Sequence, residues 1–165
     1  MRFYVDVSQN MSDSILQKNH DRSFCSIIRS GDKWYFQILI EPFPVLILNI
    51  NTKSNQCVST EGIYHCSGKI IYSRLNIQQA IPGRLYIADA KFDPYCFGTQ
   101  YTMQNAKMIR HKEYFDDAQD LYGFGDINAD FPIYEYAHGQ FVKLDKNGQL
   151  VAIYVKFAGS KLILG

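Results

Sequence analysis

Residues 140–157 read QFVKLDKNGQLVAIYVKF, and this stretch decides the fold class that we predict. Apolar residues alternate on both sides of Asn147-Gly148, a dipeptide that strongly indicates a two-residue type I′ hairpin turn. Such a turn pairs Leu144 with Val151. A longer loop would pair Leu144 with Leu150 and would move the apolar residues of the second strand to the face of Lys143. We therefore predict the first register, in which one apolar face carries Val142, Leu144, Val151, Ile153, Val155 and Phe157.

The rest of the chain is dense in further strand candidates. We expect strands near residues 2–7, 24–29, 33–41, 45–51, 62–65, 69–74, 84–88 and 131–137. Pro42 and Pro44 cannot donate to a sheet ladder, so they predict a corner between two of these strands. Aromatic residues make up 15% of the chain, and this share also favours strands, because rings pack well across a pleated surface.

One main helix is predicted at about residues 112–122. Phe115, Ala118 and Tyr122 form one apolar stripe, and Gly123 supplies a C-terminal stop. A start near residue 112 also places acidic residues in the first turns, where they favour the helix dipole. A shorter helical segment is considered at Ser12–Lys18.

Together these patterns predict an α+β fold that is mainly antiparallel β. We expect a single twisted sheet, a half-barrel or a sandwich, with the helix at about 112–122 packed on it. The 165 residues show no shift in composition that would mark a boundary, so residues 1–165 are predicted to form one globular domain.

Charge and cysteine content narrow the classes of partner. The 17 basic and 16 acidic residues leave a net charge of +1, which provides no overall field to attract nucleic acid or anionic lipid. We therefore expect neither a nucleic-acid nor a membrane partner. The chain starts without a secretory signal pattern, so we expect a cytoplasmic protein whose four cysteines are reduced thiols.

Residues 113–130 contain six acidic residues and no basic one, with aromatic residues between them. Such a segment concentrates negative potential, and its rings could anchor a protein interface. The alternative is that the rings belong to the core and the acids form a solvated helix face. The residues predicted to bind a partner are Asp116, Asp117, Asp120, Tyr122, Phe124, Asp126 and Asp130.

The end of this segment resembles the opening of an EF-hand or dockerin calcium loop. Asp126, Asn128 and Asp130 match its first three ligand positions. The match then fails, because Phe131 replaces the required glycine and Ala137 stands where a bidentate glutamate is needed. No nucleophile or phosphate-loop motif occurs either. We therefore predict no metal, no cofactor and no catalytic residue.

These observations favour a non-enzymatic, cytosolic protein-binding protein. Its most concrete form is an immunity- or antitoxin-type inhibitor that caps a basic toxin, for example a nuclease domain, through the acidic aromatic surface. The alternative is a small-ligand-binding β-barrel-like protein, or a hydrolase, with an aromatic-lined cavity.

Overall fold

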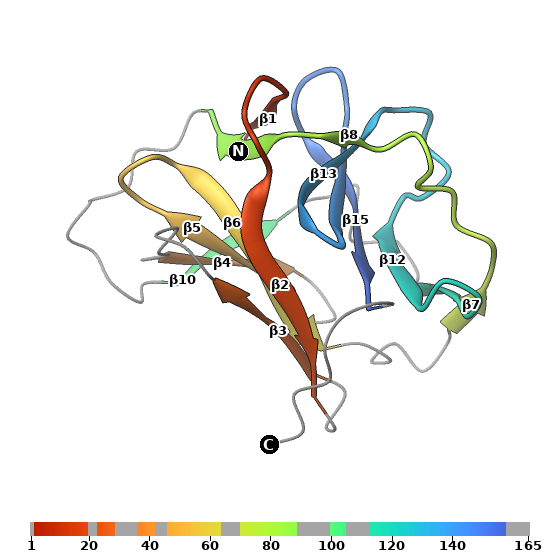
Figure 1. The fold of residues 1–165 in the computed structure, drawn as a ribbon. Helices are drawn as coiled ribbons and strands as arrows, with labels where there is room; N and C mark the ends of the chain where they lie inside the picture. The colour runs from red at the N-terminus through yellow and green to blue at the C-terminus, as the bar shows by residue number, and fades with distance from the viewer. Residues whose placement is uncertain are drawn as a thin grey trace.

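The computed structural model describes residues 2–19, 23–28, 36–41, 46–63, 70–88, 100–104 and 113–157. Within these ranges all regular secondary structure consists of β-strands (Figure 1). The strands are β1 (Phe3–Asp6), β2 (Ser12–Lys18), β3 (Ser23–Ile28), β4 (Phe36–Glu41), β5 (Leu46–Asn51), β6 (Gln56–Ile63), β7 (Ile70–Tyr72), β8 (Ile81–Pro82), β9 (Arg84–Ile87), β10 (Gln100–Gln104), β11 (Glu113–Asp116), β12 (Leu121–Gly125), β13 (Ile133–His138), β14 (Gln140–Leu144) and β15 (Leu150–Lys156). The described ranges contain no candidate for a membrane-spanning helix.

The strands form a single mixed sheet whose pairs are mostly antiparallel. Its main path runs β10-β4-β5-β6-β3-β2-β13-β14-β15-β12-β11-β7, and β1, β8 and β9 attach beside this path. In Figure 1, β4, β5 and β6 lie on one side of β2, and β13, β15 and β12 lie on the other. The prediction of a mainly antiparallel β fold is thus confirmed. The Pro42–Pro44 corner lies outside the described residues.

The helix predicted at about residues 112–122 is wrong, because residues 113–125 form a β-hairpin. Strands β11 and β12 pair antiparallel around a turn at residues 117–120. Phe115 and Tyr122 are seven residues apart, which fits helical spacing, but they are directly opposite each other in this hairpin and their rings stack at 4.4 Å. Asp120 has a φ of 49°, a left-handed conformation that a helix cannot contain.

The shorter helix considered at Ser12–Lys18 is also wrong, because these residues are β2. Its side chains alternate between buried and half-buried, as a strand covered on one face requires. Ser12 and Ser14 are buried, and the Ser14 hydroxyl donates to the carbonyl of Val58 across the sheet at 2.9 Å. Polar residues on the inward face concealed the period of two.

The hairpin at residues 140–157 forms, with most of its predicted register. Val142 pairs with Ile153 and Lys143 with Ala152, as expected, but a bulge follows and Leu144 pairs with Leu150 rather than Val151. The turn is wider than a type I′ turn: the amide of Gly148 donates to the carbonyl of Asp145, and Gly148 has a φ of 76°. Asp145 stabilises this turn by accepting from the amides of Asn147 and Gln149, each at 2.9 Å.

Strands β12, β14 and β15 are buried on both faces, and this explains their nearly continuous apolar sequences. One face joins the large core, which includes Phe3, Leu48, Leu85, Tyr136, Val142, Ile153 and Val155. The opposite face packs Leu121, Phe141 and Tyr154 against Leu75, with Ile77, Ile127 and Ile133 at its margin. The segments at residues 73–81 and 126–133 therefore cover the second face of these strands.

A buried amide links the two parts of the sheet. The side chain of Gln140 accepts from the amide of Thr60 at 2.6 Å and donates to the hydroxyl of Ser14 at 3.0 Å. Ser26 donates to the same Gln140 oxygen at 3.3 Å. This one fully buried side chain therefore joins β14 to β2, β3 and β6. The Cys25 and Cys57 thiols are free, and Cys66 and Cys96 lie outside the described residues.

Candidate functional site

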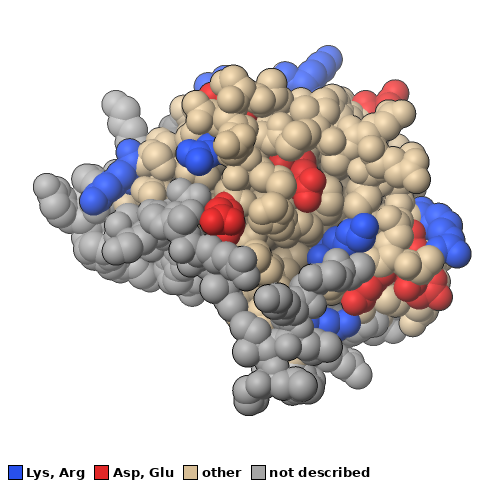
Figure 2. Space-filling view, in the orientation of Figure 1, with Lys and Arg blue, Asp and Glu red and all other residues tan. Residues whose placement is uncertain are grey.

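The predicted partner-binding residues divide into buried and accessible groups. Asp116, Tyr122 and Phe124 are buried, with exposed fractions of 1%, 1% and 3%. Asp117 and Asp130 are exposed, whereas Asp120 and Asp126 are partly exposed. The accessible acids lie in two loops at opposite ends of β12. On the face shown in Figure 2, acidic side chains lie in small groups among Lys and Arg and form no single large patch.

Tyr122 and Phe124 are parts of the core, so the expectation that they are surface anchors is wrong. The Tyr122 ring stacks on Phe115 and meets Phe157 edge-on, with ring centroids 5.8 Å apart. Phe124 belongs to the same core cluster. Both side chains point to this cluster because the extended backbone of β12 places alternate residues on one face.

Asp116 is a structural carboxylate that joins the β11–β12 turn to residues 74–75. It accepts from the Leu75 amide at 2.9 Å, the Gln119 side chain at 2.8 Å and the Arg74 guanidinium at 3.1 Å. It also accepts from the Ala118 amide at 3.1 Å. Burial alone would raise the pKa of Asp116, but these hydrogen bonds and the Arg74 charge outweigh burial and lower it. Its charge is therefore satisfied inside the chain.

At the same turn, Asp120 has a cationic neighbour while Asp117 is open to solvent. The ammonium of Lys18 lies 3.5 Å from a carboxylate oxygen of Asp120 and 5.2 Å from the centre of the Phe157 ring. The left-handed backbone of Asp120 is tolerated here because Asp, with its short polar side chain, adopts it more easily than most residues.

The loop at residues 126–131 is wrapped around the ammonium of Lys143. This group donates to the carbonyls of Ile127 at 2.9 Å and Ala129 at 2.8 Å. Burial lowers the pKa of Lys143, and the nearby charges of Asp126 and Asp130 oppose that lowering. The loop that resembles the opening of a calcium site therefore has a cation from its own chain among its oxygens. Among the described residues, no group of three His, Cys, Asp or Glu side chains could hold a metal ion.

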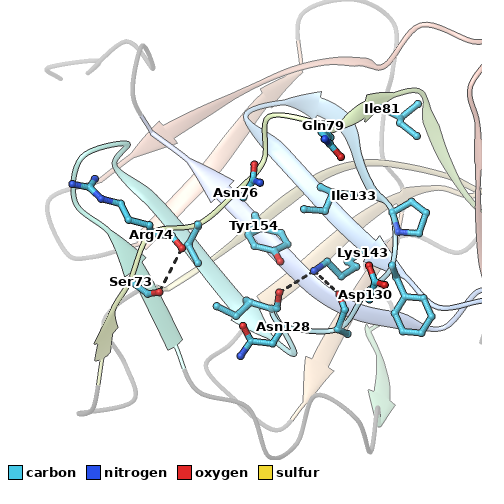
Figure 3. A pocket seen from close by; sticks show the side chains of 15 residues that line it. Ser73, Arg74, Asn76, Gln79, Ile81, Asn128, Asp130, Ile133, Lys143 and Tyr154 are labelled. Atoms are coloured by element: carbon cyan, nitrogen blue, oxygen red, sulfur yellow. Dashed lines mark hydrogen bonds between the residues drawn. The ribbon is translucent and has the colours of Figure 1, made fainter.

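A cavity of about 580 Å³ lies beside this loop (Figure 3). One wall comes from residues 73–81 and the other from residues 127–133, and Lys143 and Tyr154 project from the strands between them. Asp116 holds the first wall in place through Arg74 and Leu75, and Lys143 holds the second through the loop carbonyls. Only Phe131 and Tyr154 among the lining residues are aromatic, so aromatic rings form a small part of this lining.

Tyr154 is the ring at the base of the cavity. It is only 2% exposed, and the Lys143 ammonium lies 6.0 Å from the centre of its ring. Burial, with a further contribution from the charge of Asp126, raises the pKa of its hydroxyl. The group therefore stays protonated at neutral pH and is available as a hydrogen-bond donor.

The sequence contains one signal for this cavity that was not used to locate it. Both strands of the 140–157 hairpin are apolar on both faces, which implies a cover over each face. Lys143 interrupts one of these faces, and a buried lysine requires hydrogen-bond partners. The cover over the strands and the hydrogen-bond partners of Lys143 come from segments that are distant in the sequence.

The search for relatives adds no further constraint. No protein-family model matches the chain, and a search of curated proteins finds no match.

Proposed function

We propose that this chain is a non-enzymatic protein-binding protein that recognises a cationic partner. Its most concrete form is an immunity- or antitoxin-type inhibitor of a basic toxin, such as a nuclease domain, in the cytoplasm. The observation that carries the proposal is the accessibility of four carboxylates in the two loops that flank β12: Asp117, Asp120, Asp126 and Asp130.

The two most exposed acids are the main contacts in this proposal. Lys18 and Lys143 partly offset the charges of Asp120 and of the Asp126 loop, whereas Asp117 has no cation of its own among the described residues. The loops are separated by the length of β12, roughly 17 Å for five extended residues. A basic surface of one protein domain can span this distance, and carboxylates at the rim of an interface accelerate association with such a surface.

The test is affinity purification from native lysate with three forms of the full chain. The double variant Asp117→Lys/Asp130→Lys reverses two charges, and Asp13→Lys on β2 makes the same type of change outside both loops. The proposal expects one basic protein to be retained by the unaltered chain and by Asp13→Lys. That protein should be lost with the double variant and at high salt, because exposed charges are screened.

Measurements on the purified pair then test whether the chain is an inhibitor. Binding should inhibit the activity of the partner, and the double variant should associate about tenfold more slowly, because rim charges act mainly on the association rate. Equal retention of the same proteins by the double variant and the control would exclude a role for these carboxylates.

A second candidate function is the binding of a small ligand in the cavity. The volume of about 580 Å³ lies within the range of roughly 300–1,000 Å³ that is usual for small-molecule sites. A buried ammonium and a buried phenol at its base favour this function, because buried polar groups are normally hydrogen-bonded. A broad fragment screen by protein NMR tests it.

A further inference from the structure

The base of the cavity presents two buried hydrogen-bond donors. Lys143 is 5% exposed and Tyr154 is 2% exposed. An ammonium has three N–H groups, and the carbonyls of Ile127 and Ala129 occupy two of them. The Tyr154 hydroxyl makes no hydrogen bond with any residue that the structure describes. Figure 3 shows both side chains inside the space that the lining residues enclose.

The two walls add further polar groups at the rim: amides that can donate and accept, and a carboxylate that only accepts. Gln79 and Asn128 carry exposed amide side chains, and Asp130 contributes an exposed carboxylate. None of these three side chains hydrogen-bonds to another described residue. Ile81 and Ile133 add apolar surface to the same walls. The cavity therefore combines donors at its base, acceptors at its rim and aliphatic patches between them.

The charges around the cavity disfavour an ionic ligand of either sign. Arg74 is paired with Asp116, at a distance of 3.1 Å between nitrogen and oxygen. Lys143 lies in the field of Asp126 and Asp130. An anion would be repelled by the two loop carboxylates, and a cation would be repelled by Lys143. A neutral ligand avoids both penalties.

We propose that the cavity binds a neutral, hydroxyl-rich ligand of the monosaccharide or disaccharide class. Each hydroxyl of such a ligand can accept from Lys143 or Tyr154 and donate to Asp130 or to an amide oxygen at the rim. The C–H faces of a sugar ring match the aliphatic patches of Ile81 and Ile133. This inference rests on the second candidate function, and it specifies the ligand class.

The experiment is an NMR titration of the full chain, uniformly labelled with ¹⁵N. The probes are glucose, galactose, mannose, N-acetylglucosamine, maltose and lactose, with inorganic phosphate, acetate and spermidine as ionic comparisons. We expect at least one saccharide to shift the resonances of residues 73–81 and 127–133 in a saturable manner.

Two variants connect binding to the proposed groups. Tyr154→Phe removes only the hydroxyl at the base, and Gln79→Ala removes an exposed amide that has no structural contact to lose. Each should weaken saccharide binding about tenfold or more. Tyr86→Phe is the matched control, because Tyr86 stacks on Tyr4 outside the cavity, at a ring distance of 5.2 Å. If Tyr154→Phe impairs folding, saccharide binding by Gln79→Ala alone tests the assigned site.

The outcomes separate this inference from the function on which it rests. Saturable binding of phosphate, acetate or spermidine in the cavity, without any saccharide, would overturn the ligand class and leave small-ligand binding in place. Absence of any ligand from the panel and from the fragment screen would overturn both. Saccharide binding that is unchanged in Tyr154→Phe and Gln79→Ala would overturn the assigned site.

Discussion

Replacing Asp116 by alanine should destabilise the chain far more than the same change at its neighbour Asp117. The carboxylate of Asp116 accepts four hydrogen bonds, including one from the amide of Leu75, a residue that is only 5% exposed. An orphaned buried donor costs about 1–3 kcal/mol, and hydrogen bonds to a charged group contribute about 1.5–3 kcal/mol. Because these bonds share one carboxylate and Arg74 is well exposed, we expect a total loss of about 3 kcal/mol.

Urea denaturation at pH 7 measures this loss, with Asp117→Ala as the matched control. Asp117 is exposed in the same turn, so its replacement should change the free energy of unfolding by less than about 0.5 kcal/mol. In thermal unfolding, Asp116→Ala should lower Tm by roughly 6–12 °C for a chain of this size. A difference between the two variants below about 1 kcal/mol would refute the assignment of Asp116 as a structural carboxylate.

The pH dependence provides an independent check on Asp116. Its pKa in the folded chain is below the ordinary value of 3.8, so the unfolded chain takes up the proton at higher pH. The stability that this carboxylate provides is therefore complete above the ordinary value and is lost as pH falls through the folded pKa. The stability gap between the unaltered chain and Asp116→Ala should narrow at acid pH. A gap that stays constant down to pH 2.5 would contradict the lowered pKa.

Three further changes test contacts inside the fold, one of them at the cavity. Gln140→Leu removes the buried amide that joins β14 to β2, β3 and β6. In urea denaturation, this change should lower the free energy of unfolding by about 2–3 kcal/mol. Gln149→Leu, at an exposed position, is the control and should change it little. Gly148→Ala should lower the free energy of unfolding by at least about 1–2 kcal/mol in the same assay, because φ is 76° and a Cβ would lie 2.5 Å from the Phe3 carbonyl oxygen. An unchanged urea midpoint would exclude that close approach. Burial lowers the pKa of Lys143, so the unfolded chain keeps this proton to higher pH than the folded chain does. The free energy of unfolding should therefore rise as pH increases from the folded pKa towards the ordinary value of 10.5. Lys143→Met should lose this rise in a pH series of denaturation curves, and an identical pH profile for both chains would contradict the prediction.

The strands that sequence analysis located share a clear local signal. The predicted strands near residues 2–7, 24–29, 45–51, 84–88 and 131–137 all correspond to strands of the structure within a few residues. The 140–157 hairpin was recognised with its main register, because alternating apolar residues around an Asn-Gly turn specify which faces meet. The bulge at Leu144 and the wider turn were missed, since both depend on how Asp145 stabilises that turn.

The helix at residues 112–122 failed for a reason that applies to many short segments. Apolar residues at Phe115 and Tyr122 fit both a helical stripe and a cross-strand pair, so local spacing could not distinguish the two. The hairpin is stabilised by the pairing of β12 with β15 and by the contacts of Asp116 with residues 74–75. Those contacts join parts of the chain that are 27 to 42 residues apart, so tertiary interactions override local propensity here.

The exposure of the predicted partner-binding residues was anticipated only in part. The exposed positions of Asp117 and Asp130 match the expectation of accessible acids, but Asp116, Tyr122 and Phe124 are interior. Composition cannot reveal this division, because an acidic side chain in a turn can point outwards or can satisfy buried amides. A ligand cavity was the alternative expectation, but its location, with Lys143 and Tyr154 at its base, was not predicted.

By itself, the sequence determined the class of structure: its aromatic and β-branched residues, its alternating patterns and its Asn-Gly turn made a mainly antiparallel sheet the expected result. Only the tertiary structure decided which carboxylates are free and where a ligand could enter. The physical reason is that strand formation depends on patterns within a few residues. The burial of Asp116 and the support of Lys143 instead depend on partners brought together by the sheet order.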